Sequence, residues 1–355
     1  MKEFLEQFTE EYNRELPFYG NIRVTSRGTV VYEASVGYAD LERGIPLTSD
    51  SLFTLYSISK PFCAIGLLLL RDRGLVDLDA HPGVYVPEAC WADERVTIRH
   101  LLHHISGLPD FDLSWAFTGK APLFAFFDPR EQLSLLRNVP MLFAPGTSAQ
   151  YANVNFVLCA LIIENVSGIP YAEYMKKEVF GPLGMTTASV DHEGLDLPGS
   201  VQGYDWDGTV LRPVAPCRSW LFGAGDIVGT TADVYCLHDA VQHRKLLKPE
   251  TWKEVLTPSP LNGMGMGCTL SLWHGRKRIT HNGGHIGFRT LHIHLPEDDF
   301  DIILLSNCGF GDARNVFSEA IYEAWYGAED RTSENVKDLS GDRMRSAVSH
   351  IDFPC

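Results

Sequence analysis

Hydrophobic and polar positions along the chain change their spacing twice. After a first amphipathic helix, two segments rich in β-branched residues, 21–26 and 29–36, flank the pair Arg27-Gly28, which is typical of a β-hairpin. From about residue 55 the pattern becomes helical, and a glycine closes several of the runs. The predicted helices cover residues 57–73, 97–106, 153–167 and 231–243.

Beyond residue 262 the pattern returns to strands and ends with a helix. The spacing predicts strands at 264–273, 278–281, 288–295 and 301–306, separated by His-Gly, Gly-Gly and Pro-Glu-Asp-Asp turns, and a helix at 312–326. The most economical arrangement pairs the first hairpin with these late strands in one antiparallel sheet flanked by the terminal helices.

The sequence therefore predicts an α+β fold with an inserted, mostly helical subdomain. Residues 1–54 and 262–327 are assigned to the sheet subdomain, residues 55–261 to the helical one, and residues 328–355 to a polar C-terminal tail. The cleft between the two subdomains is the expected site.

Composition narrows the possible partners. The chain has 355 residues, of which 45% are hydrophobic, so it is long enough to bury a large core. A net charge of −15 repels nucleic acid and anionic membranes, and the apolar run 64–70 is far shorter than the roughly 20 residues that span a bilayer. No nucleic-acid or membrane partner is expected, and the oligomeric state is left open.

The N-terminus and the cysteines favour a cytoplasmic location. The first residues alternate apolar and charged side chains and lack the apolar core of a secretory signal. Eight cysteines occur without a C-x-x-C pair, which fits a reducing compartment better than a disulfide framework.

The strongest chemical signal is Ser57-x-x-Lys60 at the start of a predicted helix. Residues three apart lie on one helix face, so the hydroxyl and the amine can meet. A lysine takes the serine proton only if burial or nearby positive charge lowers its pKa, and the apolar flank after Lys60 supplies burial. The motif by itself is common by chance.

Two further segments add weight to that motif. Tyr151-x-Asn153 follows Pro145-Gly146 and precedes an apolar helix, so the phenol can reach a cleft and move a proton. In isolation, this pattern is more often an aromatic plug with an asparagine helix cap.

The second segment, His281-Asn282-Gly283-Gly284, brings bare backbone to a strand end. The N–H groups of Gly284 and Ser57 would form a two-donor oxyanion hole, although an ordinary glycine-rich hairpin would show the same pattern.

Together these three motifs, in this order, resemble the serine β-lactamase and penicillin-binding-protein superfamily, in particular the branch of class C β-lactamases, esterases and D-amino-acid peptidases and amidases. The resemblance covers about residues 17–327. Its supporting segments are Gly37-Tyr38-Ala39-Asp40, residues 101–108, Pro145-Gly146, residues 162–168 and residues 181–185.

The resemblance implies a β-lactamase/transpeptidase-like fold and an acyl-enzyme on Ser57. Lys60 and Tyr151 would share the acid and base work, and Asn153 would bond a substrate amide or Lys60. His281 stands where relatives usually carry lysine, and Asn282 where they carry threonine or serine, so the usual contact with a substrate carboxylate is weakened. This departure favours small esters, amides or short peptides, often of D-configured residues, over β-lactams.

The sequence also allows other interpretations. His100, His103 and His104 lie close together on one predicted helix, but the glutamate of a zinc-protease motif is absent, so neither a metal nor a cofactor is expected. An acyltransferase using the same acyl-enzyme, and a catalytically silent ligand-binding protein with this fold, remain as alternatives to a serine hydrolase acting on a small-molecule or short-peptide substrate.

Overall fold

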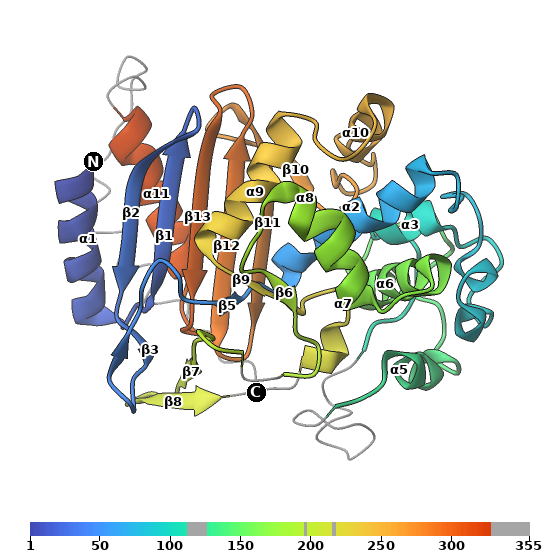
Figure 1. Cartoon of the computed structure of the whole chain (residues 1–355), viewed down its shortest axis with the longest axis horizontal. Coiled ribbons are helices and arrows are strands. Elements are labelled where there is room, and N and C mark those ends of the chain that lie inside the picture. The colour runs from blue at the N-terminus through green and yellow to red at the C-terminus, as the bar shows by residue number, and fades with distance from the viewer. Residues whose placement is uncertain (112–125, 195–196, 215–217, 328–355) are drawn as a thin grey trace.

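The computed structural model describes residues 1–111, 126–194, 197–214 and 218–327, so the predicted tail at 328–355 lies outside the described residues. Its largest element is a six-stranded antiparallel sheet with the order β10-β11-β12-β13-β1-β2 (Figure 1). The predicted pairing of the first hairpin with the late strands is confirmed. The strands are β1 Gly20–Ser26, β2 Thr29–Val36, β10 Thr269–Trp273, β11 Arg276–His285, β12 Phe288–Leu295 and β13 Phe300–Ser306.

Both faces of the sheet are covered, which strand β13 shows most clearly. Ile302 and Leu304 point into the core beneath the terminal helices α1 (Lys2–Glu15) and α11 (Ala313–Tyr326). Ile303 and Leu305 point the other way, into the core shared with the helical part. Because side chains alternate between the two faces, the strand has an apolar face on each side, and most of its sequence is hydrophobic.

The helical part is centred on two long buried helices, α2 (Ser59–Asp72) and α6 (Val154–Ser167). It occupies the right half of Figure 1, next to β11 and β12. Its other helical segments are α3 Ile98–Leu102, α5 Pro129–Leu136, α7 Tyr171–Tyr174, α8 Gly181–Leu183, α9 Thr231–Gln242, α10 Pro249–Val255, the short 3₁₀ helices η1 Tyr56–Ile58, η2 Pro82–Val84, η3 Pro87–Ala89 and η5 Arg218–Leu221, and the π-helical stretch η4 Met175–Phe180.

Smaller sheets lie outside the six-stranded sheet. Strand β5 pairs with β9, which pairs with β6, and separate two-stranded ribbons join β3 to β4 and β7 to β8. These strands are β3 Tyr38–Asp40, β4 Ile45–Pro46, β5 Phe53–Thr54, β6 Ser189–Val190, β7 Gly203–Trp206, β8 Leu211–Val214 and β9 Ile227–Gly229.

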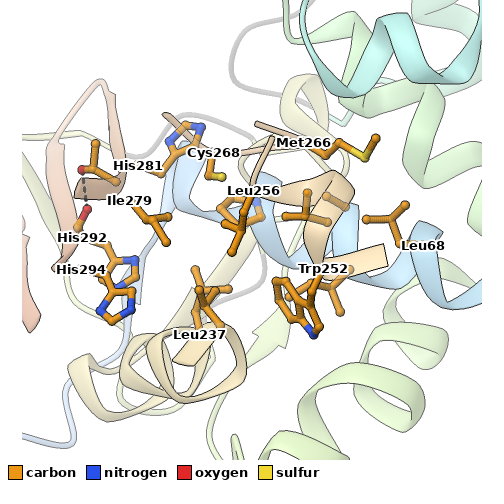
Figure 2. Close-up of a pocket in the computed structure, with 16 residues that line it drawn as sticks. Leu68, Leu237, Trp252, Leu256, Met266, Cys268, Ile279, His281, His292 and His294 are labelled. Atoms are coloured by element: carbon orange, nitrogen blue, oxygen red, sulfur yellow. Dashed lines mark hydrogen bonds between the residues drawn. The ribbon is translucent and has the colours of Figure 1, made fainter. Parts of the chain in front are cut away.

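The helices α2, α9 and α10 meet the sheet around a small cavity. Its volume is about 30 Å³, and Leu68, Leu237 and Trp252 form its apolar wall, while His292 and His294 reach it from β12 (Figure 2). The cavity has room for one or two water-sized groups.

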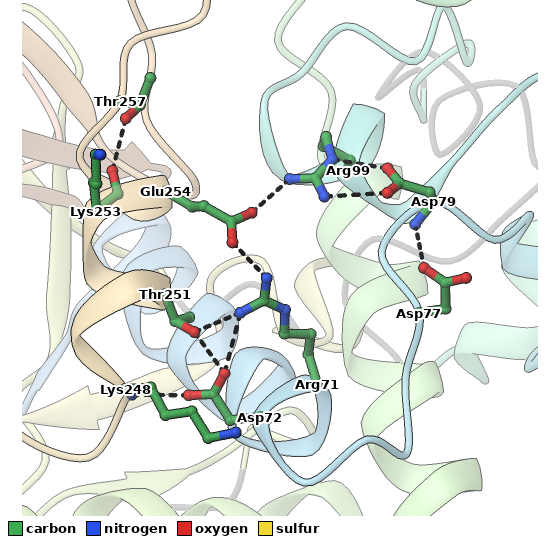
Figure 3. A network of polar contacts seen from close by, with 10 residues as sticks. All are labelled: Arg71, Asp72, Asp77, Asp79, Arg99, Lys248, Thr251, Lys253, Glu254 and Thr257. Carbon is green, nitrogen blue, oxygen red and sulfur yellow. Dashed lines mark hydrogen bonds and ion pairs between the residues drawn. The ribbon is translucent and has the colours of Figure 1, made fainter.

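An ion-pair network fixes α10 against the helical part. Glu254 of α10 accepts hydrogen bonds from Arg71 of α2 and, at 2.9 Å, from Arg99 of α3 (Figure 3). Burial alone would raise the pKa of Glu254, but these bonds from Arg99 and Arg71 lower it. The carboxylate therefore stays ionised and joins three helices at one point.

Two sequence predictions about strands are wrong in their limits. Gly283 and Gly284 were expected in a turn but lie inside β11, and the turn falls at Ile286 and Gly287. A Cβ on Gly283 would come within 2.4 Å of the carbonyl oxygen of Leu55, so this glycine permits close approach of two backbones. The strand expected at 264–273 is paired as β10 only from Thr269, because residues 259–268 fold into turns.

No single helix in the described ranges is long and apolar enough to cross a membrane. A bent pair, Val154–Ser167 with Tyr171–Leu183, meets the requirement by length and composition only, and its first member is packed inside the core.

Replacing Phe317 by alanine should strongly destabilise the layer of terminal helices. Its ring is fully buried and stacks on Phe18 at 4.5 Å, so we expect the free energy of unfolding to fall by about 3–5 kcal/mol. Chemical denaturation measures the change. Phe4→Ala is the matched control because Phe4 is 49% exposed, and it should change stability by no more than about 0.5 kcal/mol. Equal effects of the two substitutions would contradict this account of the layer.

Candidate active site

The backbone on either side of Ser57 is fixed by hydrogen bonds that join Leu55 and Ser59 to two sheets. The N–H of Leu55 donates to the carbonyl of Ile227 at 2.8 Å, and the N–H of Ile227 donates to Ser59 Oγ at 3.0 Å. From β12, the Thr290 hydroxyl donates to the carbonyl of Leu55 at 2.8 Å. Ser57 is the one residue of 51–60 that is not buried, so its hydroxyl faces the cleft on a fixed backbone.

The residue before Ser57 has a strained backbone. Tyr56 has a φ of 47°, in the left-handed region that side chains with a Cβ disfavour. Its hydroxyl donates to the carbonyl of Ile286 at 3.2 Å, which ties the turn to the end of β11. Such strain persists only where the surroundings fix it, and it is common at functional sites.

Lys60 lies one helical turn beyond Ser57 and is fully buried. Its Nζ is 3.0 Å from Ser57 Oγ, 2.9 Å from Asn153 Oδ1 and 2.8 Å from the carbonyl oxygen of Ala224. The oxygens of Asn153 and Ala224 only accept hydrogen bonds, so they take two N–H groups of Lys60. The third position on the nitrogen, facing Ser57, is a proton in the charged amine and a lone pair in the neutral one.

Burial decides which of these forms is present near neutral pH. It lowers the pKa of Lys60 to about 7, although the negative charge of Asp110 acts in the opposite direction. A large share of the amine is therefore neutral at pH 7, with its lone pair directed at the Ser57 hydroxyl. This arrangement can remove the proton of the serine.

Tyr151 lies beside Lys60 and is supported from below by His104. The Lys60 Nζ is 4.8 Å from the centre of the Tyr151 ring. The His104 ring stacks on the same Tyr151 ring, with 4.3 Å between the ring centres. Burial raises the pKa of the Tyr151 phenol, with hydrogen bonding to Ser57 acting against it, so the phenol keeps its proton. A protonated phenol at this place can donate to a leaving group.

His104 itself is neutral and structural. It is fully buried, burial holds its pKa well below the usual value, and its Nδ1 accepts from the N–H of Ala152 at 3.2 Å. This bond fixes the backbone next to Tyr151, and the Tyr151 ring stacks on the His104 ring.

Asp110 orients Asn153 and caps helix α6. Its carboxylate accepts from the N–H of Asn153 at 2.7 Å, from Asn153 Nδ2 at 3.2 Å and from the N–H of Val154 at 3.0 Å. Because the amide nitrogen of Asn153 faces a carboxylate, its oxygen must face Lys60. Asp110 therefore supplies the helix cap, and Asn153 makes no side-chain cap bond of its own.

The remaining acceptor, the carbonyl of Ala224, is presented by a tight turn. Gly223 has a φ of 68°, and a Cβ there would lie 2.3 Å from the Cβ of Ala160 in α6. The buried carboxyl of Asp226 accepts from the N–H of Gly223 at 2.9 Å, and burial raises its pKa to about 7. This Gly-Ala-Gly-Asp segment positions a carbonyl for the lysine.

The end of β11 forms the opposite wall of the cleft. Strand β10 pairs with β11 only as far as Thr280, so on this side residues 281–285 have no strand partner among the described residues. A Cβ on Gly283 would lie 3.0 Å from the nitrogen of Ser57, which brings the two backbones together. Gly284 and Asn282 are exposed and line the cleft with Ser57.

His281 does not supply a positive charge. It is buried, and burial with the nearby Lys60 lowers its pKa to about 3. Its Nδ1 is 2.7 Å from the carbonyl oxygen of Asn282. The imidazole is thus neutral, in line with the expectation that the lysine of relatives has no charged equivalent at this position.

Two arginines bring positive charge to the cleft from another direction. Nη1 of Arg314, at the start of α11, donates to the carbonyl of Gly283 at 2.8 Å, and Nη1 of Arg289 donates to the carbonyl of His285 at 2.9 Å. A methyl group on Gly284 would lie 3.5 Å from Nη1 of both arginines. In the described structure neither makes an ion pair with a carboxylate, although Asp205 lies on the same wall and attracts Arg289.

The cleft that joins these groups has a volume of about 610 Å³. The structure gathers Ser57, Tyr151 and Asn153 around Lys60. It places Asn282 and Gly284 on the cleft wall, whereas Gly283 is buried and His281 lines the small apolar cavity instead. The histidines at 100, 103 and 104 use separate partners: His100 caps α3, His103 bonds the carbonyl of Met264, and His104 supports Tyr151.

Comparison with known proteins agrees with this geometry. The family model described as Beta-lactamase matches residues 20–322. The chain belongs to the beta-lactamase family. Relatives in this comparison include enzymes named D-aminopeptidase, esterase and D-amino acid amidase. The catalytic roles of Ser57, Lys60 and Tyr151 stay a prediction.

Several family members are similar over most of this chain. Penicillin-binding protein 4* of Bacillus subtilis is 28% identical, with 86% of this chain and 72% of that protein covered. A D-aminopeptidase of Gluconobacter oxydans is 30% identical over 81% of this chain, which spans 55% of that longer protein. The crystal structure of D-amino acid amidase from Ochrobactrum anthropi complexed with D-phenylalanine superposes with a TM-score of 0.78 at 25% identity, covering 92% of this chain and 99% of that one.

Sequence reasoning missed the part that five residues play in this site. Asp110, His104 and the carbonyl of Ala224 act through other residues, and no spacing along the chain marks them. Asp110 does follow the family-like segment 101–108, which was the one available signal. Arg289 and Arg314 lie after the recognised motifs and reach the cleft only because β12 and α11 flank β11.

The rate of Ser57 acylation should follow the neutral fraction of Lys60. Because the pKa of Lys60 is lowered to about 7 and only the neutral amine accepts a proton, the second-order rate should fall about tenfold per pH unit below pH 7 and level off above it. Stopped-flow measurement with an activated ester checks the profile. A rate independent of pH between 5 and 8 would contradict this role.

Asp110→Asn should move that profile toward lower pH. The negative charge of Asp110 raises the pKa of Lys60, so its removal lowers the midpoint. Asp128→Asn is the matched control, since Asp128 also caps a helix, α5, but is not among the charges that act on Lys60. A midpoint that stays in place in the first variant, or moves equally in both, would refute the coupling.

Proposed function

We propose that this chain hydrolyses a small ester, amide or short peptide that carries an anionic group near the scissile carbonyl. The observation that carries the proposal is the buried Lys60 amine, 3.0 Å from Ser57 Oγ, with its other hydrogens donated to fixed acceptors. In this arrangement the serine is activated without a metal or cofactor.

Acylation begins with proton transfer from Ser57 to the neutral amine of Lys60. Ser57 Oγ then forms a bond to the carbonyl carbon, and the developing oxyanion is directed at the N–H groups of Ser57 and Gly284. The close packing of Gly283 on the backbone of residues 55–57 holds these donors in place before the substrate arrives. Such preorganised donors are worth about 10²- to 10³-fold in rate each.

Collapse of the tetrahedral intermediate requires a proton on the leaving group. Tyr151 supplies it, since its raised pKa keeps the phenol protonated, and it regains a proton from the charged Lys60 beside it. Water entering the open cleft then attacks the acyl carbonyl by the reverse transfers, which releases the acid and restores Ser57.

The anionic preference comes from Arg289 and Arg314. Both guanidinium groups flank Gly284, where the carbonyl oxygen of the substrate would sit, and neither is neutralised by an ion pair within the described residues. The chain carries a net charge of −15, so these arginines form a local positive site in an acidic protein and would draw a carboxylate into the cleft.

The similarity to a D-aminopeptidase and a D-amino acid amidase supports an amide or peptide that contains a D-residue. A free carboxylate on such a peptide would meet the arginines, which take over the role that a lysine at position 281 has in relatives. The proposal includes both amide and ester substrates, because both would form the same kind of acyl-enzyme.

Ser57 should be the residue that becomes covalently modified. Incubation with a fluorophosphonate should add one label per chain by intact-protein mass spectrometry, and Ser57→Ala should abolish it. The same variant should lose more than about 10³-fold in turnover of p-nitrophenyl esters and D-alanyl amides. Ser134→Ala, at an exposed serine of α5, should be labelled normally. Absence of both label and turnover in the wild-type protein would favour a silent ligand-binding protein.

Arg289→Gln should lower activity selectively toward anionic substrates. Loss of a charge-assisted hydrogen bond is worth about 1.5–3 kcal/mol, so kcat/KM for a p-nitrophenyl hemisuccinate should fall about 10- to 100-fold, mainly through KM. For the neutral p-nitrophenyl acetate it should change by no more than about twofold. Arg212→Gln, at an exposed arginine outside the cleft wall, is the control. Equal losses on both esters would show that Arg289 acts only on the structure.

A further inference from the structure

A cluster of buried histidines and aspartates lies between helix α9 and the sheet, away from Ser57. It contains His238 of α9, His292 and His294 of β12, Asp301 of β13 and Asp299 of the turn before that strand. The side chains of His238, His294 and Asp301 are 1%, 0% and 0% exposed. None of these residues has a part in the acyl-enzyme chemistry.

Several polar atoms of the cluster lack a partner. Both ring nitrogens of His294 and the Oδ2 of Asp301 lack a hydrogen-bond partner among the described residues. The main chain of Phe300 lies near His294. The cavity that His294 also lines is mostly apolar, with Leu237, Trp252 and Ile279 among its lining residues (Figure 2). A buried unsatisfied polar group typically costs about 1–3 kcal/mol, so this arrangement calls for a ligand.

His238 is oriented as metal-binding histidines are. Its Nε2 is 2.9 Å from Asp299 Oδ1, and its Nδ1 is 3.2 Å from Asp301 Oδ1. A neutral imidazole that donates to Asp299 presents a lone pair to the second carboxylate, which is unfavourable unless a cation lies between them. A carboxylate bonded to the outer nitrogen is also the usual support of a metal ligand.

The spacing of the candidate ligand atoms suits a small divalent ion. One atom each from His238, His294 and Asp301 lies within 4.8 Å of the other two. Ligands bound tetrahedrally to zinc at about 2.0–2.1 Å are about 3.3 Å apart, so modest contraction completes the site. His292 Nε2, 2.8 Å from Asp301 Oδ1, holds the carboxylate in place.

We propose that His238, His294 and Asp301 form a buried structural site for a divalent transition metal, with zinc as the fitting ion. Two imidazoles and one carboxylate are ligands that zinc commonly takes. The metal would cross-link α9 to β12 and β13 and so join the helical part to the sheet. This site is separate from the proposed hydrolase function and does not depend on it.

The competing arrangement is a cluster held by a proton. Burial alone would lower the pKa of His238, but bonding to Asp301 and Asp299 raises it, so a charged imidazole could bridge the two carboxylates. That arrangement satisfies His238 but leaves His294 without a partner. The two cases differ in metal content and in the response to substitution of His294.

The test uses the full chain produced in zinc-supplemented medium and then dialysed. Elemental analysis should find about one zinc per chain in the wild-type protein, and His294→Leu should lose it. His243→Asn is the matched control, because it removes a histidine that is 61% exposed at the end of the same helix, and it should retain the zinc. X-ray absorption at the zinc edge should show two imidazoles, oxygen and no sulfur.

Stability gives an independent measurement. For wild-type protein prepared in metal-depleted medium, zinc at about 100 times its dissociation constant should raise the Tm by about 3–6 °C, and His294→Leu should show no shift. Absence of zinc and of any Tm shift in the wild-type protein would overturn the proposal, as would full zinc retention by His294→Leu or sulfur ligands at the zinc. If His294→Leu does not fold, the absorption spectrum of the wild-type protein still decides the ligands.

Discussion

The structure of the active site depends on keeping one amine buried and held in place on three sides. Lys60 is surrounded by a side-chain amide, a main-chain carbonyl and the serine hydroxyl, and these acceptors come from different elements of the fold. Burial disfavours the charged amine, while the acceptors fix its direction. The cap of α6 by Asp110, the turn at Gly223 and the packing of α2 on α6 each serve to hold that environment.

The same constraint explains why the sequence predicted the residues that meet at Lys60 better than the residues that hold them in place. Ser57 and Lys60 are linked by helix geometry, so a spacing of three residues was enough to predict that they meet. Tyr151 and the segment at His281 were recognisable through their order along the chain. Asp110 and Ala224 reach Lys60 across the tertiary structure, where no local pattern records the contact.

The fold, like the site, could be predicted in part from the sequence. Strand and helix types followed from periodicity, and the pairing of the first hairpin with the late strands followed from the need to bury both. The errors fell where tertiary packing overrides local preference. Gly283 and Gly284 have the composition of a turn, but they continue β11 because another backbone lies against Gly283. The histidines at 238 and 294, far apart along the chain, meet only through the packing of α9 on the sheet.

The wide sequence separation of the groups around Lys60 has a consequence for the folding of the chain. Residues 57, 153, 224 and 284 meet only after segments more than 200 positions apart have docked, and contacts of such high sequence separation form late and slowly. A partly folded chain leaves this amine in water, where it is protonated and its serine is an ordinary alcohol. The arrangement that would activate Ser57 is therefore present only in the completed native state, so a chain that has not finished folding lacks it.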